Sequence, residues 1–130
     1  MKLLSLCLVI LLFIGCYPVD HLRVYELMLQ ASEIPYAASM DIIKTPVQTL
    51  ADNEGDCGDL SGLLASWMIA EGLRPLEFVI WDGEDSRAYH ANIRYFGVIY
   101  DPVFVVWKQD WVEVNSYRWI DLQIMWFNQD

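Results

Sequence analysis

The segment GDCGDLSGLLASWMIAEGL, residues 55–73, carries the strongest structural signal in the chain. Its apolar residues recur three and four positions apart, which predicts a helix from Cys57 or Gly58 to Glu71. Gly72 predicts the left-handed C-cap that ends this helix. The apolar face consists of Leu60, Leu63, Leu64, Trp67 and Met68. A cysteine is therefore expected in the first turn of a helix that packs against a core.

One helix is predicted before this segment and several strands after it. Residues 20–33 repeat apolar side chains at helical spacing, with Asp20 as N-cap and Pro35 beyond the end. The connection over 36–55 is expected to be ordered, with a helical turn at 47–50. Strands are predicted at 76–81, 88–95, 98–101 and 103–107, and as a pair within 111–126. Helices followed by strands, joined by short turns such as Asp82-Gly83, predict an α+β fold with N-terminal helices packed on an antiparallel sheet.

The composition is that of one small acidic domain. The chain has 130 residues, with 8 Lys and Arg against 18 Asp and Glu, and a net charge of -10. Its 6 Trp, 7 Tyr and 5 Phe supply enough apolar surface to exclude disorder as the main state. The basic residues are scattered singly, which argues against a nucleic-acid partner, because phosphates bind clustered cations. The oligomeric state stays open.

Residues 1–16 predict an export signal. Lys2 precedes an apolar run over residues 3–14, which is shorter than the about 20 residues of a transmembrane helix. Residues 13–16, Phe-Ile-Gly-Cys, resemble a bacterial lipobox, in which cleavage falls before the cysteine and the thiol is acylated. We therefore expect a lipoprotein signal peptide over 1–15 and an exported domain over 16–130, anchored by lipid at Cys16 to a membrane of the cell envelope. An ordinary signal peptide or an uncleaved anchor would also export the domain.

Cys57 is the one cysteine that this scheme leaves unexplained. Cys7 leaves with the signal peptide and Cys16 is lipidated, so Cys57 has no disulfide partner. At a helix start, free backbone N–H groups and the helix dipole favour a thiolate, which is the attacking form of sulfur. The alternative is burial as a small apolar side chain.

An acidic cluster surrounds Cys57. Glu54, Asp56 and Asp59 are the anions near the thiol, and with Asp52 and Asn53 they form a group of oxygen-bearing side chains that could be considered for calcium. Carboxylates that crowd a sulfur oppose its ionisation, so Cys57 would need a base to react. The cluster lacks the Gly at the sixth position and the Glu at the twelfth that an EF-hand calcium loop requires, and a solvated acidic loop is expected instead.

His90 is the candidate base, because the other histidine of the exported domain, His21, lies beside the proposed lipid anchor. Side chains alternate along a strand, so the strand at 88–95 has one more polar face. That face carries His90, Asn92 and Arg94.

Asp101 is the candidate residue to orient His90. A hairpin loop at residues 95–96 would place the two opposite each other, and a loop at 96–97 would place them diagonally. Both registers keep them on one face, whereas a three-residue loop would separate them. The expected arrangement is a nucleophile, a base and an orienting group, Cys57, His90 and Asp101. The same side chains are a weak zinc set, since no short-range ligand pair accompanies them.

Several stretches resemble the bacterial transglutaminase-like cysteine peptidases. The matching stretches are 45–50 (TPVQTL), 55–60 (GDCGDL) and 68–73 (MIAEGL), followed by Tyr89-His90-Ala91 and Tyr100-Asp101-Pro102. The second carries the Gly-Asp-Cys-x-Asp motif in which the nucleophile opens the core helix. The resemblance covers about residues 42–107, with Cys, His and Asp in the order of that superfamily.

This resemblance implies a papain-like fold and thiol acyl transfer without a cofactor. Cys57 would attack an amide or peptide carbonyl of a protein or peptide substrate, His90 would carry the proton, and Asp101 would orient the imidazole. The backbone N–H of Cys57 is one donor for the oxyanion. Gln48 and Asn53 are candidates for the second, as amides upstream of the nucleophile.

Two functional hypotheses follow. The first is an envelope-anchored cysteine peptidase or amidohydrolase in which water or an amine resolves the thioester. The second is a catalytically inactive module that keeps the fold and binds a partner. An aromatic tail, formed by Trp107, Trp111, Trp119 and Trp126, favours this second hypothesis.

Gly58 is a departure from the family pattern. Calcium-dependent members of the transglutaminase-like superfamily carry an acidic residue directly after the cysteine, and Gly58 puts calcium dependence of this chain in question.

Overall fold

The order of elements along the chain is helices first and strands afterwards. The computed structural model describes residues 19–39, 42–82, 89–104 and 112–118. The helices are α2 (His21–Ser32), α3 (Pro46–Asp52) and α4 (Cys57–Ala70), and the strands are β1 (Leu76–Asp82), β2 (Tyr89–Tyr95), β3 (Val98–Tyr100) and β4 (Val112–Arg118). This order and the antiparallel pairing of the strands confirm the α+β prediction.

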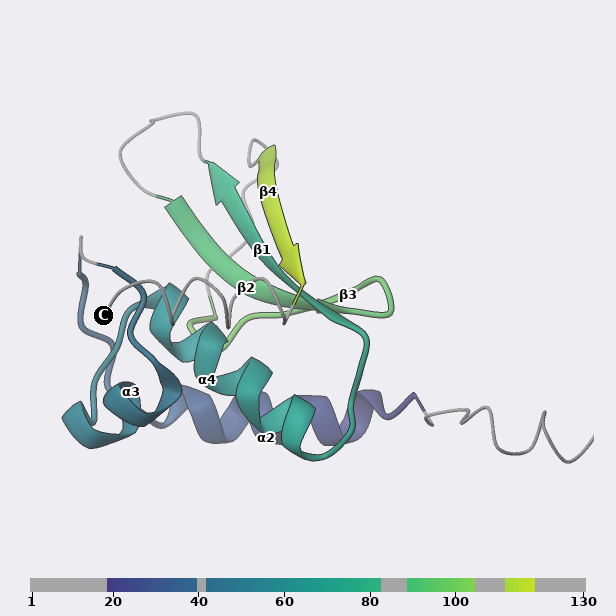
Figure 1. Ribbon diagram of the computed structural model, residues 1–130, viewed down its shortest axis with the longest axis horizontal. Helices are drawn as coiled ribbons and strands as arrows, with labels where there is room; N and C mark the ends of the chain where they lie inside the picture. Colours follow the sequence, from purple (N-terminus) through teal and green to yellow (C-terminus); the bar gives the residue numbers. More distant parts are fainter. Residues whose placement is uncertain (1–18, 40–41, 83–88, 105–111, 119–130) are drawn as a thin grey trace, which may run out of the picture.

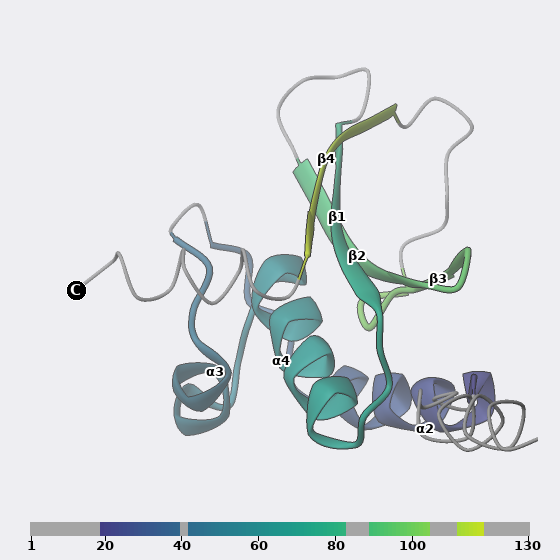
Figure 2. The same ribbon diagram turned by 45° about the vertical axis from the view of Figure 1, so that its right-hand side comes forward.

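The described sheet has four strands in the order β3-β2-β1-β4, and all neighbours are antiparallel. Helices α2 and α4 lie side by side on one side of it, and α3 lies beside the start of α4 (Figures 1 and 2). Strand β2 is therefore an inner strand with α4 packed against it.

The β2–β3 hairpin has the second of the two registers that the sequence allowed. Ile93 pairs with Tyr100, and the loop consists of Phe96 and Gly97. Both loop residues have positive φ, 45° and 77°, as a tight two-residue hairpin turn requires. His90 and Asp101 are consequently diagonal neighbours on one face of the sheet.

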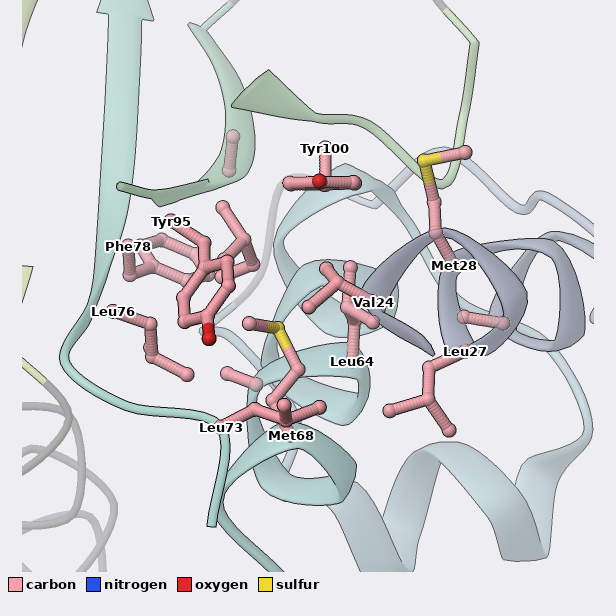
Figure 3. Packing of buried hydrophobic residues seen from close by; sticks show 14 residues of the cluster. Val24, Leu27, Met28, Leu64, Met68, Leu73, Leu76, Phe78, Tyr95 and Tyr100 are labelled. Atoms are coloured by element: carbon pink, nitrogen blue, oxygen red, sulfur yellow. The ribbon is translucent and has the colours of Figure 1, made fainter. Parts of the chain in front are cut away.

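The core lies between the two long helices and the sheet (Figure 3). Val24 of α2, Leu64 and Met68 of α4, and Phe78 and Tyr95 of the sheet are buried in one cluster. Each large apolar side chain buried in this way contributes about 1.5–3 kcal/mol. This packing fixes α4 against β2 and so holds the start of α4 beside the start of that strand.

The helix boundaries follow local signals that the sequence predicted. Asp20 caps α2 by accepting a hydrogen bond from Arg23 N–H at 2.9 Å. Gly72 has a φ of 76°, the left-handed conformation that ends α4. The helical turn expected at 47–50 is part of α3.

Some predictions fall outside the described residues. They are the signal peptide at 1–15 with Cys16, the turn after Asp82, the second strand of the pair within 111–126, and Trp107, Trp111, Trp119 and Trp126. The strand expected at 103–107 is not formed at residues 103 and 104, and its remainder is also outside. No helix within the described ranges combines the length and the apolar character needed to cross a membrane.

Candidate active site

Cys57 is the first residue of α4, and two aspartates set this helix start. Asp56 is the N-cap: its Oδ1 accepts from the Asp59 N–H at 3.0 Å, while Asp59 Oδ2 accepts from the Asp56 N–H at 3.1 Å. Asp59 Oδ1 also accepts from the Lys44 N–H at 2.7 Å. This reciprocal capping box ties the first turn of α4 to the segment before α3.

The expectation of a solvated acidic loop is wrong for Asp59. Asp59 is only 2% exposed, and both of its carboxylate oxygens accept hydrogen bonds from backbone N–H groups. Burial raises the pKa of Asp56, and hydrogen bonds from backbone N–H groups oppose this shift. Asp52 forms an ion pair with Lys44 Nζ at 2.9 Å. Asp56 and Asp59 are thus engaged by backbone donors, and Asp52 by a lysine.

The donor set of this loop does not fit a calcium site. The carboxylates of Asp56 and Asp59 are directed to backbone N–H groups, and Gly58 supplies no side-chain oxygen. Among the residues that the structure describes, no group of three His, Cys, Asp or Glu side chains is arranged to hold a metal ion.

Gly55 allows the capping box to close. A Cβ at this position would lie 2.8 Å from Asp59 Cβ, closer than two carbon atoms pack, and both residues are buried. The glycine of the motif is thus required by the inward turn of Asp59.

Two contacts align the first turn of α4 with β2. Cys57 Sγ lies 3.9 Å from the carbonyl oxygen of Tyr89, and Ser61 Oγ donates to the carbonyl oxygen of Ala91 at 3.1 Å. One turn of α4, from Cys57 to Ser61, therefore runs alongside two residues of β2, from Tyr89 to Ala91. The half-buried thiol is thereby placed beside His90.

His90 and Asp101 form a buried pair. His90 Nε2–H donates to Asp101 Oδ2 at 2.5 Å, and the two residues are 4% and 7% exposed. Asp101 Oδ1 accepts from the Val103 N–H at 3.0 Å, which holds the carboxylate in place. With Nε2 engaged by Asp101, Nδ1 is the ring nitrogen that remains for Cys57.

The pKa of His90 is raised by the groups around its ring. Burial acts to lower it, but hydrogen bonds to Asp101 and to Cys57, together with the negative charges of both groups, raise the pKa to about 9. His90 is therefore an imidazolium at neutral pH, and the structure brings Cys57, His90 and Asp101 together. Such an arrangement can generate a thiolate and carry a proton.

Tyr36 lies close enough to Cys57 for the charge of the sulfur to act on its phenol, and the sequence did not single it out. Its segment pairs with Gly55 as a parallel bridge, with Ala37 N–H donating to Gly55 O at 2.9 Å. The residue is 55% exposed, and its pKa is raised by burial of the phenol and by the charges of Cys57 and Asp56. No local pattern points to Tyr36, because the bridge joins segments on either side of α3.

The two amides proposed for the oxyanion have other roles. Gln48 Oε1 accepts from the N–H and the Oγ1 of Thr45, at 2.9 and 3.1 Å, and so closes the capping box of α3. Asn53 is the C-cap of the same helix, with φ 51°. Both residues serve the ends of α3 rather than Cys57.

Sequence comparisons give no family for this chain. No protein-family model matches it, and none of the curated proteins is significantly similar to it. The comparison with solved structures concerns the fold.

The chain is similar in structure to cysteine-protease folds. LapG of Legionella pneumophila in its calcium-bound form is 20% identical, with a TM-score of 0.65, over 79% of this chain and 67% of LapG. The EGTA-treated form gives a TM-score of 0.66 and covers 65% of LapG.

A protein of Cytophaga hutchinsonii, described as a candidate cysteine protease, is 16% identical with a TM-score of 0.60. The match covers 73% of this chain, which spans 35% of that protein. These likenesses, with the α+β architecture described above, show that the chain has the papain-like, transglutaminase-like cysteine-protease fold.

Proposed function

We propose that this chain is a cysteine peptidase or amidohydrolase in which Cys57 is the nucleophile, His90 the acid and base, and Asp101 the orienting group. One observation carries the proposal: a buried His90 is bound to Asp101 at 2.5 Å, and hydrogen bonding to Cys57 contributes to its raised pKa. Perturbed titratable groups of this kind gather at active sites.

The proposed reaction is acyl transfer through a thioester. The Cys57 thiolate attacks the carbonyl carbon, a C–S bond forms, and the carbonyl oxygen becomes an oxyanion. The Cys57 N–H, at the positive end of α4, donates to that oxyanion. The imidazolium of His90 then protonates the leaving amine as the C–N bond breaks.

A water molecule or an amine completes the cycle. It attacks the thioester carbonyl and gives a proton to the now neutral His90, and the C–S bond breaks to release the thiolate. Asp101 keeps its hydrogen bond to Nε2 throughout, so the same ring nitrogen faces the sulfur in both halves of the reaction.

A protein or peptide is the proposed substrate. The open environment of Tyr36 beside Cys57 suits an extended chain, and the structurally similar Cytophaga protein is described as a cysteine protease candidate. This chain spans 35% of that protein and 65–67% of LapG, so the substrate is proposed here and is not carried over from either protein.

The proposed location is the cell envelope, with residues 1–15 removed as a signal peptide and Cys16 as the lipid anchor of the domain 16–130. The support is the lipobox-like stretch at 13–16. Expression in a bacterium with a labelled fatty acid should label the wild-type chain and Cys7→Ser, but not Cys16→Ser. A wild-type chain that stays unlabelled would contradict the anchor.

The catalytic proposal is tested by the rate at which iodoacetamide alkylates Cys57 in the full-length chain, followed by mass spectrometry across pH. We expect alkylation well below pH 8.5, the value near which a free cysteine ionises, and loss of this low-pH reactivity in His90→Ala. A thiol that reacts only above about pH 8.5 and is indifferent to His90→Ala would refute the proposal.

A non-catalytic binding module is the alternative, motivated by the aromatic residues of the C-terminal part. It would be supported if Cys57→Ala left the biological phenotype intact while changes of surface tryptophans abolished it.

A further inference from the structure

Trp81 and Asn92 lie on the same face of the sheet as His90. Trp81 of β1 is the register partner of His90, and Asn92 is the next residue of β2 on that face. Trp81 Nε1–H donates to Asn92 Oδ1 at 2.9 Å. The indole and the carboxamide therefore form a polar pair directly beside the proposed catalytic histidine.

The hydrogen bond from Trp81 determines the orientation of the Asn92 carboxamide, that is, which side its oxygen and its nitrogen face. An indole N–H can only donate, so Oδ1 must be the atom turned toward Trp81, and Nδ2 is left on the other branch of the amide. Within the described part of the chain, Nδ2 is buried without a hydrogen-bond partner, and Asn92 is 0% exposed. Buried donors of this kind are rare and call for a specific explanation.

The sheet register indicates what the donor faces. Ile93 pairs with Tyr100, so the next position along the two chains brings Asn92 opposite Asp101. Residues opposite each other on one face of an antiparallel pair have Cβ atoms about 4.5–5.5 Å apart. Asp101 already accepts from His90 and from the Val103 N–H. An N–H group on this side is a further hydrogen-bond donor available to orient that carboxylate.

Three other charged groups that the structure describes on this sheet face form an ion cluster. Arg94 of β2 binds Glu77 of β1 at 2.6 Å and Glu113 of β4 at 2.7 Å. On this face of β2, Asn92 thus lies between Arg94 of the ion cluster and His90 of the His90–Asp101 pair.

We infer that Asn92 is a positioning residue for the proposed triad: its Nδ2 group faces the Asp101 carboxylate, and Trp81 holds the amide in the orientation that presents this donor. The inference rests on the proposed function. Asn92 acts through Asp101 on the imidazolium of His90, and thereby on the ionisation of Cys57, without touching the substrate.

The test is the pH profile of Cys57 alkylation by iodoacetamide in the full-length chain. Asn92→Leu keeps a similar shape and removes the amide, and Trp81→Phe keeps an aromatic ring and removes the N–H. We expect Asn92→Leu to lower the alkylation rate at pH 7 by about tenfold, the effect of a shift of one pH unit in the midpoint. Trp81→Phe should have a smaller effect in the same direction, because the Asn92 carboxamide stays in place but can rotate once the indole N–H is lost.

The double variant separates positioning from mere packing. Asn92→Leu removes the acceptor of the Trp81–Asn92 hydrogen bond and Trp81→Phe removes its donor, whereas the double variant removes both sides of this bond. A structural role predicts that the double variant regains the wild-type profile, which would overturn the inference. A positioning role predicts that it stays as slow as Asn92→Leu.

Thr49→Val is the matched control, since it removes a buried hydroxyl that donates to Thr45 O at 3.1 Å in α3. It should retain the wild-type alkylation profile. If Asn92→Leu does not fold, as judged by circular dichroism, the Trp81→Phe profile decides.

Two failures can be told apart. If the wild type reacts only like a free cysteine and His90→Ala changes nothing, the proposed function itself is wrong. If the wild type shows the low-pH reactivity but Asn92→Leu and Trp81→Phe both match Thr49→Val, only the role of Asn92 is overturned.

Discussion

Ser61 Oγ donates to the carbonyl oxygen of Ala91 at 3.1 Å. Ser61 lies one helical turn after Cys57, and Ala91 is the residue after His90. This buried bond ties the helix that carries the thiol to the strand that carries the imidazole. The relative position of the two groups therefore depends on a residue that takes no part in the proposed chemistry.

Ser61→Ala should loosen this connection. We expect the free energy of unfolding to fall by about 1–3 kcal/mol, because a buried carbonyl loses its partner. We also expect kcat to fall more than KM rises. Urea unfolding and steady-state kinetics on a peptide substrate measure the two effects. Ser66→Ala is the control, because Ser66 donates to Leu63 O within the same helix. Equal losses of kcat in both variants would show that the link to β2 has no special role.

Gly55→Ala should disturb the start of α4. The added Cβ would lie 2.8 Å from Asp59 Cβ, so the capping box must open or the backbone must shift. We expect destabilisation by about 1–3 kcal/mol and slower alkylation of Cys57. Gly97→Ala, in the hairpin with φ 77°, should also destabilise, by about 1 kcal/mol, yet leave the alkylation rate unchanged. If Gly55→Ala alkylates as fast as wild type, the capping box does not position the thiol.

The raised pKa of His90 predicts a pH-dependent stability. The pKa is about 9 in the folded chain against 6.5 for the unperturbed side chain. A group with a raised folded pKa stabilises fully below its unfolded pKa and loses this effect as the pH rises through the folded value. The difference in free energy of unfolding between wild type and His90→Gln should thus shrink from pH 6.5 to 9, by about 1–3 kcal/mol. Denaturant titrations at a series of pH values measure it; a difference that stays constant would contradict the assignment.

Tyr36 should affect substrate binding more than the reactivity of the thiol. We expect Tyr36→Ala to raise KM for a peptide substrate several-fold while alkylation by the small reagent iodoacetamide stays near the wild-type rate. Tyr25→Ala on α2 is the control, since Tyr25 is 47% exposed against 55% for Tyr36. A parallel loss of alkylation in Tyr36→Ala would instead assign the phenol to the chemistry.

The fold was largely predictable because its signals are local. The apolar spacing after Cys57 and the glycine at 72 define α4, and alternation defines β2. The position of His90 and Asp101 on one sheet face needed only strand alternation and a two-residue loop. The choice of register did not follow from local signals, because the observed loop puts Phe96 at a positive φ, which disfavours a bulky residue.

What the sequence missed depends on long-range contacts. The burial of Asp59 follows from its bond to the Lys44 N–H, fifteen residues away in the chain. Tyr36 is brought into the neighbourhood of Cys57 by a bridge to Gly55 across α3. The complete burial of Asn92 was not predictable from alternation, which gave only a more polar face of the strand.

The capping box at Asp56 and Asp59 also bears on how relatives of this chain should be recognised. Its carboxylates are committed to backbone donors, so selection for folding alone would preserve the two aspartates and Gly55 in a descendant that had lost its chemistry. A Gly-Asp-x-x-Asp pattern thus reports the architecture of this helix start. Evidence that a homologue still turns over a substrate must be sought at the thiol, the imidazole and Asp101, three positions that the helix start does not need.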